Sequence, residues 1–276
     1  MRTILASVGL MTICLLVAGL SFAIDPASVT EGHVYLLDNV SGTDVPDDSA
    51  NDNTATIVGD PQVVPGLSGK ALKFDGVDDA VHIPDSQFIN ITNGPWANRT
   101  VMAVFNCADV SKSEKQTVFE EGGTTRGFNI YVFEGKVYVG AWNRAEYNAD
   151  LSWEGSWPSA PIGSNEWHAV AFVLRDAPDE VAPDKFEMWM DGDLVAKEPA
   201  GQMYNHSADN SIGDTNGDTY FHDESFSGSG NFFEGMVDEL WIFNEALSAA
   251  DLGAILTSVE PMSKLTGSWG AIKAQH

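Results

Sequence analysis

Positive charge is scarce in this sequence. Its 276 residues include 14 lysines and arginines against 40 aspartates and glutamates, so the formal net charge is −26 at pH 7. A chain this acidic repels polyanions, which argues against nucleic acid or anionic lipid as a ligand. The charge suits a salty medium or divalent cations bound at the surface. A plainer interpretation, that it only keeps the protein in solution, stays open.

Long apolar runs are also absent beyond the N-terminus. Residues 4–20 form such a run, Arg2 is the only charge before it, and the small residues of 21–23 follow it. This pattern predicts a cleaved secretory signal over 1–23, leaving a mature chain of net charge −27 that is secreted, extracellular or periplasmic, with no membrane insertion. The alternative is an uncleaved membrane anchor, for which the run is marginally short. Lipid attachment at Cys14 is not expected, because an isoleucine precedes it.

Cysteine is scarce as well, with two residues in the whole chain. Cys14 lies in the expected signal, so only Cys107 remains and no internal disulfide can form in the mature chain. The domain must therefore be held by its core, to which a bound metal could add stability. Cys107 lies in the apolar stretch VMAVFNCADV, which favours a small buried hydrophobe over a reactive thiol or an intermolecular bridge.

From residue 33 onward the chain is rich in short β-prone runs, separated by Gly, Asn, Asp and Pro. A spacing near ten residues is typical of a β-sandwich or barrel. Glu134-Gly135 and Asp191-Gly192 each separate two such runs and predict tight hairpins. We expect strands at 34–40, 70–76, 80–84, 99–107, 116–122, 128–135, 136–143, 167–175, 185–192, 193–199 and 234–244.

One helix is expected, in the stretch ALSAADLGAIL at 246–256. Ser248 and Asp251 have the spacing of a capping box, and Leu252, Ile255 and Leu256 form an apolar stripe. Residues 259–276 then follow as an appended tail.

Six short motifs occur in a set order along the chain. They are DDSANDN at 47–53, KALKFDGVDD at 70–79, EWHAVAF at 166–172, MDGDLV at 190–195, GMVDEL at 235–240 and ALS at 246–248. Together they resemble the laminin-G-like domains of the concanavalin A-like lectin/glucanase jelly-roll family, over about residues 33–256. The resemblance implies an all-β fold, a two-sheet antiparallel β-sandwich with one short C-terminal helix, spanning 24–258. It also implies a non-catalytic binding role whose ligand the fold does not name.

The motif VDELWIF predicts an inward-facing carboxylate. Strand alternation places Asp238 with Leu240 and Ile242 on one face, and Val237 on the other. A buried carboxylate is costly without donors or a cation. Families of this kind often hold calcium there, so the resemblance implies a structural calcium. The set we expect comprises Asp238, Asp78 or Asp79, the carbonyl of Gly76, and Asp47 or Asp48. The alternative is that Asp238 caps backbone N–H groups and that Asp78-Asp79 shape a turn.

A second acidic loop, DTNGD at 214–218, begins like an EF-hand. It has no glycine at the sixth position, and Ser225 stands where the EF-hand glutamate belongs. An EF-hand is therefore not expected. An Asx-rich loop is favoured, and a loop calcium near a ligand stays open.

The carboxylate string of jelly-roll glycoside hydrolases is missing. No E-x-D-x-E pattern occurs; Glu120 and Glu121 are adjacent and so point to opposite faces, and Glu187 shares a strand face only with the turn residue Asp191. The basic and aromatic residues that a polysaccharide lyase needs show no recognisable spacing here: Arg126, Tyr131, Tyr138 and His168. We predict that the protein is not an enzyme, with a hydrolase or lyase of the same fold as the lesser alternative.

Aromatic residues gather around one predicted hairpin and the loop after it. Tyr138 and Trp142 share a strand face beside Asn143, and the polar loop that follows contains Trp153 and Trp157. Aromatic faces stack on sugar rings and amides bind hydroxyls, which predicts a glycan or glycoprotein ligand. The alternative is that these aromatics fill the core or pin the loop.

A protein-docking or surface-assembly role is the second functional hypothesis. It depends on Trp241, which alternation places on the face opposite Leu240 and Ile242, and on the tail at 259–276. Cover of Trp241 by the N-terminal strand or the tail is the competing interpretation.

Overall fold

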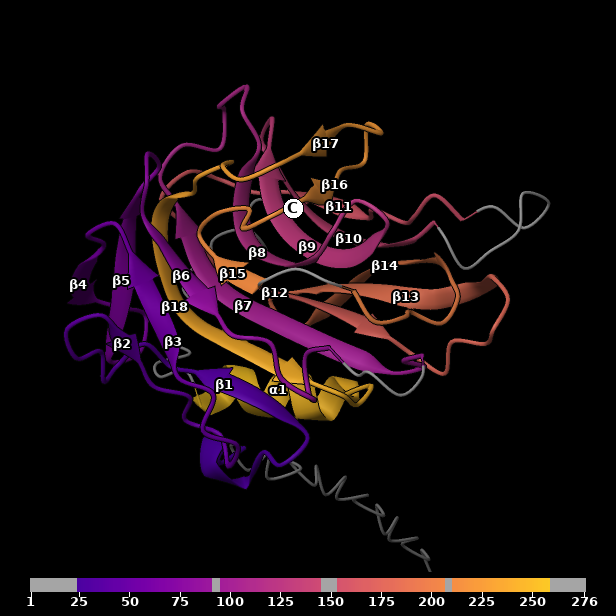
Figure 1. The fold of residues 1–276 in the computed structure, drawn as a ribbon, viewed down its shortest axis with the longest axis horizontal. Helices are drawn as coiled ribbons and strands as arrows, with labels where there is room; N and C mark the ends of the chain where they lie inside the picture. Colours follow the sequence, from indigo (N-terminus) through magenta and orange to yellow (C-terminus); the bar gives the residue numbers. More distant parts are fainter. Residues whose placement is uncertain (1–23, 91–94, 145–152, 207–209, 259–276) are drawn as a thin grey trace, which may run out of the picture.

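The computed structural model describes residues 24–90, 95–144, 153–206 and 210–258. In this part of the chain the strands form two eight-stranded antiparallel sheets that face each other, and the predicted β-sandwich is confirmed (Figure 1). Among these residues no helix is long and apolar enough to cross a membrane. The expected signal at 1–23 and the tail at 259–276 lie outside the described residues.

The first sheet, sheet A, has the strand order β14-β13-β12-β7-β18-β5-β4, with β1 pairing the second half of β18. Its strands are β1 (Gly32–Tyr35), β4 (Gln62–Pro65), β5 (Lys70–Asp75), β7 (Arg99–Cys107), β12 (Trp167–Leu174), β13 (Ala182–Met190), β14 (Asp193–Ala200) and β18 (Glu234–Phe243).

The second sheet, sheet B, has the order β11-β10-β9-β8-β15-β6-β3-β2. Its strands are β2 (Asp44–Val45), β3 (Ala55–Val58), β6 (Ala80–Ile83), β8 (Gln116–Gly122), β9 (Arg126–Phe133), β10 (Lys136–Asn143), β11 (Ser159–Pro161) and β15 (Asn210–Ile212). A small hairpin, β16 (Thr219–Tyr220) and β17 (Phe226–Ser227), lies beside β8 and β9.

The main core lies between the two sheets, because strand alternation turns one face of each inward. Phe128 of sheet B stacks on Phe172 of sheet A with ring centroids 4.9 Å apart. Cys107 belongs to this core, as predicted, and burial raises the pKa of its thiol to about 11. That thiol therefore stays protonated and unreactive at neutral pH.

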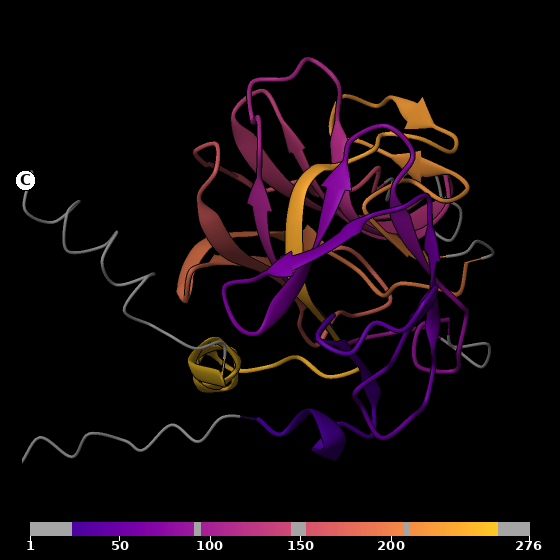
Figure 2. The ribbon, with the colours of Figure 1, turned by 90° about the vertical axis from the view of Figure 1, so that its left-hand side faces the viewer.

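A second apolar cluster joins the outer face of sheet A to helix α1 (Ala249–Ser258) and the N-terminal segment, which includes the short 3-10 helix η1 (Pro26–Ser28). Figure 2 shows α1 end-on at the side of the sandwich. The predicted capping box is confirmed: the amide of Ser248 donates to Asp251, and the amide of Asp251 donates to the Ser248 hydroxyl. Leu252 and Ile255 are buried against the sheet.

Trp241 lies inside this second cluster and is 1% exposed. Strand β1 pairs beside it, with Val34 opposite Trp241, and its indole N–H donates to Glu239 at 2.7 Å. The outward-facing Trp241 expected for protein docking is therefore covered, because α1 and the N-terminal segment pack on this face of sheet A.

A β-bulge at Asp238 breaks the alternation assumed for β18. On the β7 side the register shifts between Val237 and Glu239, so Val237 faces the main core together with Leu240 and Ile242. The prediction that Val237 lies on the opposite face from these two was wrong, because a bulge adds one residue to the strand. The bulge also marks the point where the other edge of β18 passes from β5 to β1.

Both predicted hairpins are confirmed. Glu134-Gly135 and Asp191-Gly192 have positive φ at both positions, the geometry of a tight turn that matches strand twist. The strand expected at 34–40 ends early, at Tyr35, because Leu37 takes a φ of 59° that no strand accommodates.

Candidate functional site

The outer face of sheet B carries a layer of aromatic side chains. On β9 and β10 every second residue turns away from the core, which brings Tyr131 and Tyr138 together as a stacked pair with centroids 5.0 Å apart. We call the whole group the aromatic layer; its members are Tyr131, Tyr138, Trp142, Trp157, Tyr220, Phe221, His222 and Phe226.

Most of the aromatic residues predicted to stack on a ligand are buried. Trp142 is 0% exposed, donates its indole N–H to the carbonyl of Gly123 at 2.8 Å, and stacks on Trp157. Trp153 is 5% exposed and belongs to the main core. Their ring faces are thus not open to a sugar. Trp153 fills the core, the alternative interpretation, whereas Trp142 is buried within the aromatic layer on the outer face of sheet B.

The two other residues of β10 that were predicted to contact a ligand are also buried. Tyr138 is 9% exposed beneath His222, and Asn143 is 0% exposed with its amide N–H donated to the carbonyl of Gln202. Trp157 alone of the predicted set is partly exposed. The sequence shows which residues are aromatic, but it does not show that β16 and β17 return to cover them.

At the exposed edge of the aromatic layer an arginine lies over two rings. The guanidinium of Arg144 is 4.6 Å from the ring centroid of Tyr220 and 5.1 Å from that of Phe226. It also donates to Glu154 at 2.6 Å, and Phe226 is 54% exposed. This combination offers an apolar ring face and charged hydrogen-bonding groups at one surface.

A polar pocket of about 350 Å³ adjoins Arg144 at the end of the β8–β9 hairpin. Arg144 is hydrogen-bonded to two residues that line the pocket. Its guanidinium donates to the carbonyl of Thr124, and its backbone amide donates to the carbonyl of Thr125. The described lining residues are Gly123, Thr124, Thr125, Arg126, Asn205, His206 and Asp218. Of these, Arg126 and Asp218 were considered from the sequence, Asp218 as part of the acidic loop at 214–218. The lining comes from three separate segments that no local motif connects.

The pocket floor is held by buried charges. His206 reaches Glu121 at 3.3 Å, and Glu121 also pairs with Arg99. Burial opposes ionisation of Glu121, but the charge of Arg99 and the contact with His206 outweigh it and lower the pKa of the carboxyl. The floor is therefore a rigid ionic network beneath a polar opening.

The residues predicted to bind calcium do not form one cluster. Asp238 accepts the backbone N–H groups of Leu67 and Ser68, at 2.5 and 3.1 Å, and so caps the turn between β4 and β5. Burial raises the pKa of Asp238 to about 7. The capping role weighed as the alternative is what the structure shows for this residue.

Asp47 forms its hydrogen bonds with β1 and the DDSANDN loop, away from Asp238. Its carboxylate accepts the amides of Val34, Ser49 and Asn53 and contacts His33 Nδ1 at 2.7 Å. Burial opposes ionisation, but these hydrogen bonds outweigh it and hold the pKa of Asp47 well below its usual range. Asp47 thus ties β1 to the DDSANDN loop instead of joining Asp238.

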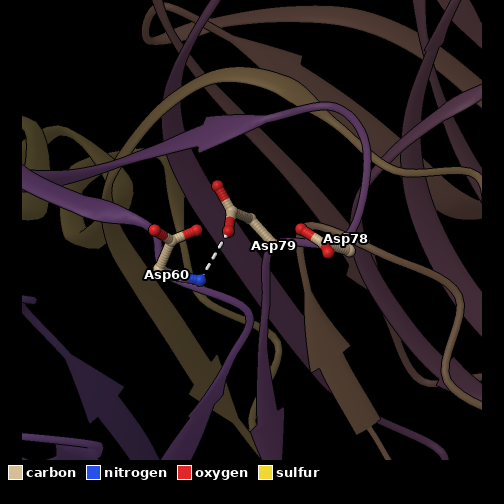
Figure 3. A group of neighbouring side chains, drawn as sticks. All are labelled: Asp60, Asp78 and Asp79. Atoms are coloured by element: carbon tan, nitrogen blue, oxygen red, sulfur yellow. Dashed lines mark hydrogen bonds between the residues drawn. The ribbon is translucent and has the colours of Figure 1, made fainter.

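Asp78 and Asp79 do meet a third carboxylate, Asp60. One oxygen from each lies within 4.8 Å of the others, and Figure 3 shows Asp79 between its two neighbours. Asp79 is buried and accepts the amides of Asp60 and Asp75, whereas Asp60 and Asp78 are exposed. Gly76, whose carbonyl was expected as a ligand, occupies the adjoining turn with a φ of 77°. The sequence pattern identified two of the three acids and missed Asp60.

A comparison with known protein families identifies the family of this chain. The family described as "Concanavalin A-like lectin/glucanases superfamily" matches residues 75–253. The chain belongs to this superfamily. No curated protein sequence matches the chain.

Solved structures of the same fold are distant in sequence. The binding domain of botulinum neurotoxin DC, in complex with rat synaptotagmin II, is 11% identical with a TM-score of 0.62, over 84% of this chain and 52% of that one. The binding domain of Paraclostridial Mosquitocidal Protein 1 is 12% identical with a TM-score of 0.58, over 83% and 52%. The chain thus spans about half the length of these toxin domains.

A third structure matches over nearly its whole length. Domain 4 of AbnA, a GH43 extracellular arabinanase from Geobacillus stearothermophilus in complex with arabinotriose, is 16% identical with a TM-score of 0.55. The match covers 82% of this chain and 98% of that domain. At these identities the likeness shows the fold. The superfamily includes glucanases, and the neighbours described here are mostly binding domains.

Proposed function

We propose that this protein is a secreted, non-catalytic carbohydrate-binding module, and that it binds its glycan at the polar pocket beside Arg144. The observation that carries the proposal is the composition of that pocket, in which hydroxyl, amide, guanidinium and carboxylate groups surround a space of about 350 Å³. Sites for small ligands usually have such a volume and a few convergent polar groups.

The chemistry of the lining suits sugar hydroxyls, which both donate and accept hydrogen bonds. Asp218 is an acceptor, Arg126 a donor, and Thr125 and Asn205 offer both functions. The exposed ring of Phe226, beneath Arg144, adds an apolar surface on which the flat face of a sugar can lie. An oligosaccharide longer than the pocket would extend over this ring.

The relatives of known structure support the same class of ligand. The arabinanase domain was solved with arabinotriose and a botulinum neurotoxin DC binding domain with SialylT. Those ligands belong to those proteins, and our proposal for this chain is only the class, a glycan or the glycan part of a glycoprotein.

The absence of a paired acid supports a non-catalytic role. Glycoside hydrolysis requires two carboxyl groups flanking the scissile bond. Of the described lining residues only Asp218 carries a carboxyl group. Glu121, beneath the pocket floor, is 0% exposed and paired with Arg99.

The structural calcium expected from the sequence is part of this proposal, at Asp60, Asp78 and Asp79. These oxygens are hard ligands of the kind calcium prefers, and the backbone of the adjoining turn would supply further ones. Calcium at about 100 times its dissociation constant would add roughly 2.7 kcal/mol of stability. The double variant D60N/D78N should lose that increment; an unchanged response of its melting temperature to calcium would remove the site from consideration.

Glycan binding is tested by screening the protein against a broad oligosaccharide and polysaccharide panel, followed by calorimetry on the best ligand. Asn205→Ala and Thr125→Ala change exposed side chains of the pocket and should each weaken affinity by about tenfold, or roughly 1.4 kcal/mol. Asn39→Ala is the matched control, an exposed asparagine on the loop between β1 and β2 that does not line the pocket. A blank panel, or equal affinity for all four proteins, would contradict the proposal.

A further inference from the structure

Three side chains from distant segments form a line of hydrogen bonds. The hydroxyl of Ser86, which follows β6, lies 2.6 Å from Nε2 of His33 on β1. Nδ1 of the same ring lies 2.7 Å from the carboxylate of Asp47. Serine, histidine and aspartate linked in this order are the nucleophile, the base and the orienting acid of many hydrolases. None of the three is a described lining residue of the proposed glycan pocket.

Asp47 fixes the direction in which the protons lie. Its carboxylate is 0% exposed and accepts three backbone amides as well as the ring of His33. Burial opposes its ionisation, but these hydrogen bonds hold the pKa of Asp47 well below its usual range. An ionised carboxylate can only accept, so Nδ1 of His33 carries the proton of that bond. In the neutral ring Nε2 then accepts the hydroxyl proton of Ser86.

Burial differs along this line in the way that nucleophilic catalysis requires. Ser86 is partly exposed, whereas the side chain of His33 is 1% exposed and that of Asp47 is 0% exposed. The ring of Phe88 packs edge-on against His33, with centroids 5.7 Å apart. The base and the acid are therefore shielded from water behind a serine that solutes can approach.

The turn that carries Ser86 is fastened to the sandwich. The carbonyl of Ser86 accepts the amides of Ile89 and Asn90, and its hydroxyl accepts the amide of Phe88 at 3.1 Å. From beneath, the buried guanidinium of Arg99 donates to the carbonyls of Phe88 and Ile89. A rigid support of this kind keeps a nucleophile at its base before any substrate arrives.

A backbone donor stands next to the nucleophile. Within the described part of the chain, the amide of Gln87 donates no hydrogen bond. The residue directly after the nucleophile supplies an oxyanion donor in α/β-hydrolases. The amide of Gln87 is therefore the group that would stabilise negative charge on a carbonyl oxygen attacked by Ser86.

We propose that Ser86 is an activated nucleophile that cleaves small acyl esters, with His33 as general base and Asp47 as the residue that positions its ring. The hydroxyl oxygen attacks the carbonyl carbon while Nε2 takes its proton. The ester C–O bond then breaks, and the leaving alkoxide receives that proton. Water, activated by the same base, adds to the acyl group on Ser86 and releases the carboxylic acid.

The expected substrate is an ester of a short acid, such as acetate. Ser86 is only partly exposed and Phe88 lies beside its base, which favours a small acyl group over a peptide. This activity would be additional to glycan binding, and the glycan pocket itself stays non-catalytic. The alternative is that the three residues only tie β1 to the segment after β6, in which case Ser86 is no more reactive than other serines.

The first test uses a fluorophosphonate probe, which reacts with activated serines and releases fluoride. The native protein should be labelled once per chain, and mass spectrometry should locate the label at Ser86. Ser86→Ala should abolish labelling, as should urea, which separates the three residues. Ser113→Ala changes an exposed serine on another loop and is the matched control. An unlabelled native protein, or labelling that persists in S86A, would overturn the proposal.

The second test measures the rate of labelling separately from its final extent. His33→Gln removes the base and Asp47→Asn removes the charge that holds the ring, so each should lower the rate constant at least about hundredfold. A merely structural role would instead lower the final extent, through the unfolded fraction. Labelling of folded H33Q at the wild-type rate would overturn the assignment of the base. Hydrolysis of p-nitrophenyl acetate, lost in S86A and kept in S113A, should follow the labelling.

Both tests are independent of the carbohydrate proposal. Neither requires a glycan, and Ser86→Ala leaves every described lining residue of the glycan pocket in place. S86A should therefore bind the best oligosaccharide of the panel with wild-type affinity. Failure of the labelling experiment would remove the esterase activity without affecting the evidence for glycan binding.

Discussion

Arg99 and Glu121 form an ion pair inside the sandwich, with both side chains 0% exposed. Arg99 begins β7 of sheet A and Glu121 lies near the end of β8 of sheet B, so the pair joins the two sheets beneath the pocket floor. Arg99 also donates to the carbonyls of Phe88 and Ile89. Glu120, one residue earlier, faces the opposite side of the strand and takes no part in this pair.

We predict that Arg99→Met destabilises the protein by about 3–5 kcal/mol, because it leaves Glu121 charged and buried without its partner. The double variant R99M/E121Q should recover much of this loss. Lys112→Met, at the solvent-exposed pair of Lys112 with Glu234, is the control and should cost at most about 1 kcal/mol. Urea unfolding measures all three, and equal losses for R99M and K112M would contradict the assignment.

Glu239 should make the protein less stable as the pH rises. Burial raises its pKa to about 8, against 4.5 for an unperturbed glutamate. Between these values the unfolded chain has released a proton that the folded chain still holds, so stability falls by up to about 1.4 kcal/mol per pH unit. Asp238, with a pKa of about 7, acts in the same direction.

Glu239→Gln keeps an acceptor for the indole N–H of Trp241 and removes the titration. The melting temperature of E239Q should therefore decline less than that of wild type between pH 5 and pH 9. Glu114→Gln changes an exposed glutamate and serves as the control. A wild-type curve that is flat or rises over this range would refute the buried, protonated state of Glu239.

Trp153→Ala should lower the stability of the protein, because Trp153 packs in the core and is not a direct ligand contact. The indole is 5% exposed within the main core, and truncating a buried aromatic costs about 3–5 kcal/mol. Trp153→Phe should cost less, since it leaves a smaller cavity. A stable W153A variant that has lost only its affinity for glycan would restore the sequence-based interpretation of Trp153 as a ligand contact.

Local patterns predicted the elements whose chemistry is local. The capping box of Ser248 and Asp251 and the two hairpin turns depend on residues a few positions apart, and they were confirmed. The bulge at Asp238 was not predictable from alternation, because it arises where β18 changes partner from β5 to β1. Short strands such as β15, with three residues, carry too little pattern to be recognised.

The candidate site was predicted less well, for the same physical reason. Its pocket takes Thr125 from one hairpin, Asn205 from a distant segment and Asp218 from a third loop. The aromatic residues that the sequence emphasised are held beneath that surface: Trp142 supports Gly123 from below through its indole N–H. Sequence composition identified where aromatic residues gather, and long-range packing decided which side chains face outward.

The central claim is that the polar pocket beside Arg144 binds a glycan. The most direct measurement is amide hydrogen exchange of the protein with and without the best oligosaccharide from the panel. Our account predicts slower exchange at 122–127 and 203–206, which contain the lining residues of two pocket segments. Protection at the exposed edge strand β14 instead, with no change at these segments, would contradict it.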